Sequence, residues 1–95
     1  MSIRLIVEFE LKAGETDAFV QMLQSAKPNI ESVEGCESVE VLLNLETPDR
    51  VALSEVWESK ELHDQYAERM REAGSMDAMA SRLAGPPKTL LFEIK

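Results

Sequence analysis

The side chains best suited to acid–base chemistry lie close together in the second half of the chain. Glu55 and Trp57 lie on the same face of an expected strand, and His63 and Tyr66 lie one turn apart on the helix expected after it. The end of a strand opposite a helix can form a pocket, and Trp57 and Met70 would be its walls. The carboxylate, the imidazole and the phenol would then supply proton donors and acceptors to a small bound molecule.

Each of these side chains also has a purely structural interpretation. Trp57 and Tyr66 could simply be packed in the core, where such rings usually lie. His63 could face solvent, although histidine is the one side chain that titrates near neutral pH. Glu55 is less ordinary, because it shares an otherwise apolar strand face with Leu53 and Trp57 and would need a partner if buried. The candidate partners are Arg4, Arg69 and Arg82.

No sequence motif for a bound metal or cofactor is present. The chain lacks a phosphate-binding glycine loop, a nucleophile elbow and a Cys-x-x-Cys pair. His63 is the only histidine, and the residues one helical turn away on either side are not metal ligands. We therefore expect neither a metal nor another cofactor.

Composition narrows the class of partner. The 95 residues include 18 acidic and 10 basic side chains, which gives a formal charge of −8. A protein surface that binds phosphates or anionic lipids carries dense positive charge, so we expect neither a nucleic acid nor a membrane as a partner. No stretch of about 18 apolar residues is present to span a bilayer. With a single cysteine, Cys36, and no signal-like N-terminus, we expect a cytoplasmic domain.

Hydrophobic spacing in the first half predicts a strand, a helix and a hairpin. Alternating apolar residues indicate a strand over residues 3–11. Residues 15–27 change to helical spacing, and Pro28 is expected to end that helix. Two further strands are expected over 36–44 and 50–57, joined by a Thr-Pro-Asp turn.

The second half adds helices and a last strand. Ser59 is a good N-cap for a helix that Gly74 is expected to end. A shorter helix is expected from Ser75 to about Leu83, and a final strand over 89–94. The longer helix has an apolar stripe that we expect to be buried, made of Leu62, Tyr66, Met70 and Ala73.

The resulting order, βαββαβ with an extra short helix, predicts an α+β fold. Right-handed crossovers would form an antiparallel sheet with helices on one face, the ferredoxin-like arrangement, in a single domain over residues 1–95. The other face would carry Ile6, Leu42, Val56 and one of the two apolar sets in 90–94. A sheet with apolar residues on both faces needs a second cover, so we expect a symmetric homodimer with the two sheets packed face to face.

Three segments carry motifs of a known family. Residues 35–41 read GCESVEV, residues 55–62 read EVWESKEL, and Pro86-Pro87 precedes a last strand that contains Phe92. In order and spacing these segments are similar to the motifs of the antibiotic biosynthesis monooxygenase (ABM) family. The resemblance covers nearly the whole chain.

The resemblance implies a dimeric α+β barrel with a pocket between each sheet and its helices. Members of the family include oxygenases that act on polycyclic phenols or quinols without metal or flavin. In such a reaction a substrate phenolate reduces O₂ directly, while the protein orients the substrate, transfers protons and excludes water. By position, Trp57 matches the pocket tryptophan of these oxygenases.

Several positions depart from the family pattern. The oxygenases carry Asn four residues before the tryptophan, where this chain has Leu53. Many members have His at the position of Tyr66, and here His63 lies one turn earlier. The haem-degrading branch uses Asn on the first strand, which is absent from residues 7–10, so haem degradation is not expected.

The leading hypothesis is a cofactor-independent monooxygenase of a quinol or polycyclic phenol. The predicted catalytic residues are Trp57, which would orient the ring, with His63 and Tyr66, and the predicted substrate-binding residues are Leu53, Glu55 and Met70. Two alternatives stay open. One is a dimeric protein that binds a small aromatic ligand without turnover, and the other is a lactone or enol isomerase on the same fold.

Overall fold

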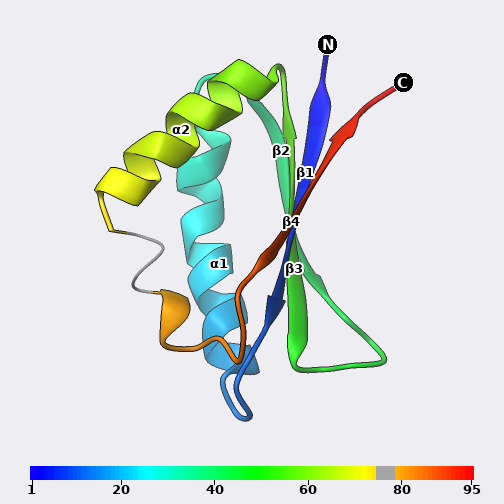
Figure 1. The fold of residues 1–95 in the computed structure, drawn as a ribbon, viewed down its shortest axis with the longest axis vertical. Helices are drawn as coiled ribbons and strands as arrows, with labels where there is room; N and C mark the ends of the chain where they lie inside the picture. Colours follow the sequence, from blue (N-terminus) through cyan, green and yellow to red (C-terminus); the bar gives the residue numbers. More distant parts are fainter. Residues whose placement is uncertain (75–78) are drawn as a thin grey trace.

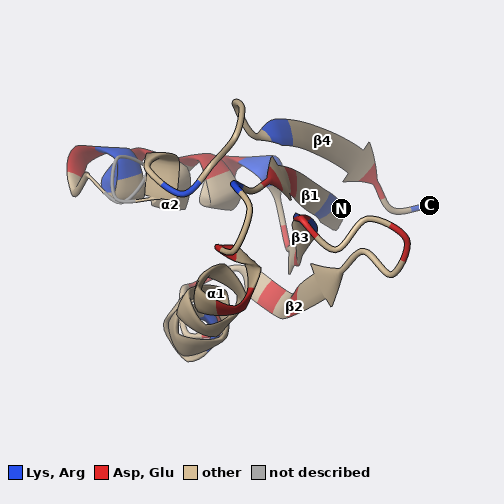
Figure 2. Ribbon diagram, turned by 90° about the horizontal axis from the view of Figure 1, so that it is seen from below, with Lys and Arg blue, Asp and Glu red and all other residues tan. Residues whose placement is uncertain are grey.

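The strands and helices follow the predicted order. A computed structural model describes residues 1–74 and 79–95. Its elements are β1 (Ile3–Glu10), α1 (Thr16–Glu31), β2 (Cys36–Leu43), β3 (Arg50–Trp57), α2 (Lys60–Glu72) and β4 (Lys88–Glu93) (Figure 1). The strands form one antiparallel sheet in the order β2-β3-β1-β4, and both helices lie on the same side of it (Figure 2). This is the ferredoxin-like α+β fold that the sequence predicts. None of the described helices is long and apolar enough to cross a membrane.

The strand register places Glu55 in the middle of the sheet. It lies opposite Leu5 on β1 and opposite Val39 on β2. Because successive side chains of a strand point to opposite faces, Leu53, Glu55 and Trp57 all point toward the helices. The three side chains are buried.

The hydrophobic core lies between this face of the sheet and α1. Phe19 and Leu23, on the predicted apolar side of α1, are both buried. The ring of Phe19 meets the ring of Phe9 on β1 edge to face, with 4.9 Å between centroids. The alternation that predicts β1 and the helical spacing that predicts α1 therefore meet in one core.

α1 is longer than the sequence predicts, because Pro28 lies inside it. We expected Pro28 to end the helix, yet α1 continues to Glu31. Proline removes only its own backbone N–H and bends the helix, so another turn can form where packing holds it. Ile30 is buried in the core, and the Ser32 N–H donates to the Pro28 carbonyl at 3.1 Å. Burial of Ile30 therefore overrides the expected stop.

α2 begins and ends at the predicted residues but packs differently. The Ser59 Oγ accepts a hydrogen bond from the Leu62 N–H at 3.3 Å, and Gly74 follows the last turn with a φ of 77°. We expected a buried apolar stripe, but none of the residues 60–72 is fully buried, and Ala73 is exposed. Figure 1 shows the helix starting beside the end of β3 and diverging from the sheet. The stripe therefore borders a space between helix and sheet.

The short helix predicted after Gly74 lies partly outside the described residues, which omit 75–78. Met79 and Ala80 are helical, and a turn follows them. Leu83 forms an isolated bridge with Leu11 beyond the end of β1. This bridge holds the segment before β4 against the sheet.

The face opposite the helices is bare and apolar in part. The residues predicted to lie there are all found there: Ile6, Leu42 and Val56. Ile6 lies opposite Leu90 on β4, so Leu90 and Phe92 are the apolar set of that strand that shares this face. Half of the Phe92 side-chain surface is exposed, at 50%, and Leu42 is exposed at 43%.

Candidate functional site

A cavity of about 460 Å³ lies between the sheet and the two helices. Its apolar lining includes Leu5, Leu23, Ile30, Leu53 and Met70, and its polar lining includes Glu55, His63, Asp64 and Tyr66. Ligand pockets typically measure about 300–1,000 Å³, so this one suits a small aromatic molecule. The structure thus brings five of the six predicted site residues to one cavity, and the sixth, Trp57, does not line it.

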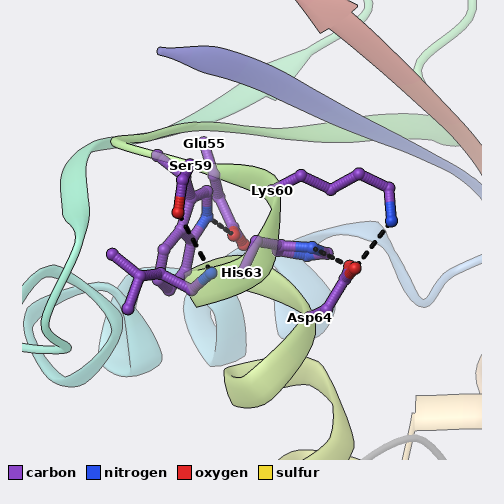
Figure 3. Close-up of polar contacts among 7 residues, drawn as sticks. Glu55, Ser59, Lys60, His63 and Asp64 are labelled. Carbon is purple, nitrogen blue, oxygen red and sulfur yellow. Dashed lines mark hydrogen bonds and ion pairs between the residues drawn. The ribbon is translucent and has the colours of Figure 1, made fainter. Parts of the chain in front are cut away.

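Glu55 is the most unusual group in this cavity. The residue is only 4% exposed, and its Oε1 accepts a hydrogen bond from the Trp57 Nε1 at 2.7 Å (Figure 3). Burial raises the pKa of the Glu55 carboxyl, and the hydrogen bond from Trp57 and the nearby His63 offset this in part. Among residues 1–74 and 79–95, the neutral indole N–H of Trp57 is the only hydrogen-bond donor to this buried carboxyl.

The partner of Glu55 is not one of the predicted arginines. Arg4 points to the other face of the sheet, where its guanidinium donates to the Ser54 Oγ at 2.9 Å. Arg82 is paired with Glu15 at 2.6 Å. Within residues 1–74 and 79–95, no cation forms an ion pair with Glu55, and this includes Arg69. The hydrogen-bond partner of Glu55 is the indole N–H of Trp57, two residues further along β3 on the same face, and not an arginine.

Trp57 lies behind the cavity and does not form its wall. The residue is completely buried, and its ring packs against the rings of His63 and Tyr66, with centroids 5.5 Å and 5.4 Å away. The expectation that Trp57 orients a bound ring by direct contact is therefore revised. Its indole holds Glu55 by a hydrogen bond and supports the two α2 side chains by packing.

His63 faces the cavity instead of solvent. Its side chain is 13% exposed, and its Nδ1 lies 3.3 Å from the Asp64 Oδ1. Asp64 in turn pairs with Lys60 at 2.6 Å, and this hydrogen bond lowers the pKa of the Asp64 carboxyl (Figure 3). Ring packing on one side and a carboxylate on the other orient the imidazole.

Tyr66 is half-buried on the same side of α2. Burial raises the pKa of its phenol, and the nearby Glu55 and Cys36 raise it further. The phenol therefore stays protonated near neutral pH and can donate a hydrogen bond into the cavity. A buried carboxyl, an imidazole and a phenol around an apolar space can hold a hydroxylated ring and exchange protons with it.

Sequence reasoning missed Asp64 and the contribution of α1. Asp64 follows the only histidine and lies one turn after Lys60, a spacing that favours an ion pair, so a signal was present. Leu23 and Ile30 line the cavity from α1. Helical spacing marks Leu23 as apolar-facing, but it does not distinguish core positions from positions that border a cavity.

The described residues contain no cluster of three or more His, Cys, Asp or Glu side chains that could hold a metal ion. Cys36, the single cysteine, is half-buried on β2 opposite Trp57, and burial raises the pKa of its thiol to about 11.

The fold and motifs match known proteins. Residues 2–71 match the family model for antibiotic biosynthesis monooxygenase. No curated protein matches the chain. A conserved protein from Methanosarcina mazei has a TM-score of 0.89 at 19% identity, covering 100% of this chain and 94% of its own. A candidate antibiotic biosynthesis monooxygenase from Nitrosomonas europaea has a TM-score of 0.88 at 19% identity, covering 98% and 89%. A Mycobacterium tuberculosis protein has a TM-score of 0.87 at 14% identity, covering 100% and 96%.

At these identities the solved structures show a shared fold and do not show a shared substrate. The family model spans well over half of the chain and includes β3 and most of α2, which carry the polar side of the cavity. The chain therefore belongs to the antibiotic biosynthesis monooxygenase family.

Proposed function

We propose that this protein is a cofactor-independent monooxygenase that oxidises a quinol or polycyclic phenol with O₂. The observation that carries the proposal is the apolar cavity with Glu55, His63 and Tyr66 on its walls. On a ring methylene group the reaction balances as R₂CH₂ + O₂ → R₂C=O + H₂O. The substrate supplies all the electrons, so the protein needs to bind, to exclude water and to move protons.

The residues divide between these tasks. Leu53 and Met70 give the ring system an apolar surface, which removes it from water. Tyr66 stands at the polar side, where its O–H can donate to an oxygen that gains negative charge, and His63 beside it can exchange a proton with the substrate. Trp57 supports this polar side, because its indole donates a hydrogen bond to Glu55 and packs against the rings of His63 and Tyr66.

Oxygen uptake by chelator-treated protein, with a panel of anthrones and hydroquinones, tests the proposal. We expect uptake of one O₂ per anthrone oxidised. We expect Tyr66→Phe to slow it by about 10²-fold or more, because removing one oxyanion donor typically costs that much. We expect His63→Ala to slow it by about 10²-fold or more as well, because a positioned acid–base group typically contributes that much. A protein that takes up no O₂ with any substrate, or variants as fast as the parent, would refute it.

Leu53 favours a second candidate function. Leu53 places an apolar side chain in the cavity, where the family's oxygenases carry Asn. A binding protein without turnover needs no such donor. It would show a rise in Tm with aromatic ligands, because a ligand that binds only the folded state stabilises it, without O₂ uptake or product.

We further propose that the protein is a cytoplasmic homodimer, with the bare sheet faces of two copies packed together. The apolar strip on this face runs across three strands and includes Ile6, Val56, Leu90 and Phe92. It shares the face with a hollow of about 390 Å³ whose lining includes Leu42 and Ala52. A second copy would bury the strip that the helices leave uncovered.

Sedimentation equilibrium at micromolar concentration tests the dimer. We expect a dimeric mass for the parent and a monomeric mass for Phe92→Glu. Leu91→Glu is the matched control, because Leu91 is equally exposed, at 47%, but lies on the opposite face of β4. A monomeric parent would rule the dimer out.

A further inference from the structure

The position of Glu55 is unusual for a carboxyl group that only maintains the fold. Its strand neighbours in register are Leu5 and Val39, both apolar and buried. A hydrophobic residue at this central position would pack without the cost of burying a polar group. Contact with a bound ligand would explain why a carboxyl group is buried in these apolar surroundings.

The two oxygens of Glu55 have different surroundings. Oε1 accepts the Trp57 N–H at 2.7 Å, whereas Oε2 has no hydrogen bond within the described residues. In that part of the chain no fully buried side-chain oxygen or nitrogen lacks a partner. Oε2 must therefore reach accessible surface, and the surface beside Glu55 is the cavity. One oxygen is anchored and the other is free to meet a ligand.

We propose that Glu55 is the catalytic residue that accepts the proton of the substrate hydroxyl, and that Trp57 is its positioning residue. This inference rests on the proposed function. The hydroxyl O–H bond breaks, its electron pair stays on the substrate oxygen, and the proton forms an O–H bond with the Glu55 carboxylate. The products are a phenolate and a neutral carboxylic acid, so the buried pair carries one negative charge before and after the transfer.

Tyr66 and His63 are the other groups in the cavity that can exchange a proton. Tyr66 is protonated near neutral pH and is a donor. His63 has Asp64 beside its Nδ1, so a neutral imidazole holds its proton there and presents Nε2 as an acceptor. His63 is therefore the competing base, and the loss of the rising limb of kcat/KM in Glu55→Gln decides between the two groups. Burial makes the Glu55 carboxylate a stronger base than an exposed carboxylate, which brings its pKa closer to that of a phenol.

The arrangement also predicts which group of an aromatic ligand lies beside Glu55. Glu55 lines the cavity, so an aromatic carboxylate placed beside it would meet negative charge, whereas Asp64 is paired with Lys60 and Arg71 lies further along the cavity. A neutral ring with a hydroxyl group would instead donate a hydrogen bond to Glu55. The expected ligand is therefore a phenol or quinol that places its hydroxyl group, and not an acidic substituent, beside Glu55.

The pH dependence of kcat/KM tests the role of Glu55. A base must be ionised, so kcat/KM of the parent rises with pH through the pKa of Glu55. Other ionisable groups lie around Glu55: His63 and Tyr66 from α2, with Asp64 and Arg71 further along the cavity, and Cys36 from β2. α1 and β1 present apolar side chains to the cavity. Comparing variants therefore isolates the contribution of Glu55.

Three variants are compared. We expect Glu55→Gln, whose amide oxygen can still accept from Trp57, to lose about 10²–10⁴-fold in kcat and to lose the rising limb. Trp57→Phe removes the donor that lowers the Glu55 pKa, so its rising limb should move to higher pH. Glu58→Gln, the same change at an exposed neighbour, should match the parent. Circular dichroism confirms that each variant is folded.

A binding measurement gives a readout that does not need turnover. The probe is 4-nitrophenol, whose ionised form absorbs visible light. Beside an ionised Glu55, the pKa of the bound phenol should rise by about one to three units, because two negative charges repel each other in a buried site. In Glu55→Gln that rise should disappear. 4-Nitroanisole has no hydroxyl, so it should bind the parent and Glu55→Gln equally.

The outcomes separate the two proposals. O₂ uptake that Glu55→Gln leaves equally fast, with the same pH profile, would overturn the role of Glu55 and leave the monooxygenase standing. A Glu55-dependent pKa of bound 4-nitrophenol without O₂ uptake would support the hydroxyl contact and overturn the monooxygenase. A bound phenol whose pKa is the same in the parent and in Glu55→Gln would overturn the contact itself.

Discussion

Gly35 lies in the turn before β2 and occupies a position that only glycine fits. Its φ is 93°, in the left-handed region, and a methyl carbon there would lie 2.6 Å from the Leu62 Cδ1 and 2.8 Å from the Leu62 Cβ. Its carbonyl accepts a hydrogen bond from the Glu58 N–H at 2.7 Å, which holds the backbone in place. Gly35→Ala must therefore strain the turn and displace Leu62, the neighbour of His63 on α2.

The free-energy cost has two parts. A non-glycine residue in the left-handed region costs about 1–2 kcal/mol. Forcing an extra methyl group into a packed site costs about 1–3 kcal/mol more. Gly35→Ala should thus lower the free energy of unfolding by about 2–5 kcal/mol. Gly14 is the matched control, because its φ is 82° and no neighbouring atom lies within 4 Å of the position that a Cβ would occupy. Gly14→Ala should show the first part alone.

Urea unfolding followed by the fluorescence of Trp57, the only tryptophan, measures both variants. All proteins are compared at one concentration, because association makes apparent stability depend on concentration. The difference between the two variants should be about 1–3 kcal/mol, the cost of the contact with Leu62. Equal losses for both variants would refute the claim that Gly35 is required for close packing against α2.

Three further predictions concern single side chains. The raised pKa of Glu55 means that the folded state holds its proton more tightly than the unfolded state. The contribution of Glu55 to the free energy of unfolding is therefore present at low pH and is lost as pH rises through its folded pKa. The loss is about 1.4 kcal/mol for each unit by which the folded pKa exceeds the unfolded pKa. Urea titrations at a series of pH values should show the free energy of unfolding falling with pH in the parent more than in Glu55→Gln. Parallel plots of this free energy against pH for the two proteins would contradict the prediction. The Cys36 thiol, with a pKa of about 11, should be about 0.1% ionised at pH 8, and iodoacetamide should modify it about 100-fold more slowly than in urea. Equal rates would show that the thiol is unperturbed. Arg82→Ala removes an ion pair with Glu15 whose side chains are 39% and 37% exposed, so the loss should stay below about 1 kcal/mol and shrink in salt. A larger loss would mean that the pair is shielded from solvent.

The separation of α2 from the sheet is the feature that makes the cavity. A helix with a fully buried stripe would fill the space above Glu55 with its own side chains. Here Tyr66 and Met70 are half-buried and border the cavity instead. The helix remains attached through Leu62, which contacts the core, and through the rings that pack on Trp57. Tyr66 and Met70, from the apolar stripe of α2, therefore line the cavity and are not fully buried in the core.

Local sequence signals determined the elements and their order. Alternating apolar residues predict β1 and β3, and Ser59 and Gly74 mark the two ends of α2. These signals depend only on residues that are close together in the chain. The candidate site residues were also identifiable, because the chain has one histidine, one tryptophan and one tyrosine, all near a carboxylate. The resemblance to the family followed from the order and spacing of three segments, residues 35–41, residues 55–62 and Pro86-Pro87.

Tertiary structure decided what each of these residues contacts. Pro28 stays within α1 because Ile30 is buried against the sheet, a contact between distant segments. Glu55 is held by Trp57 and not by an arginine, because the sheet points both side chains to one face and points Arg4 to the other. Burial, which sets the proton affinity of Glu55, depends on both helices and the sheet together. The sequence by itself determined which groups are present, whereas packing determined which of them face the cavity and which support it from behind.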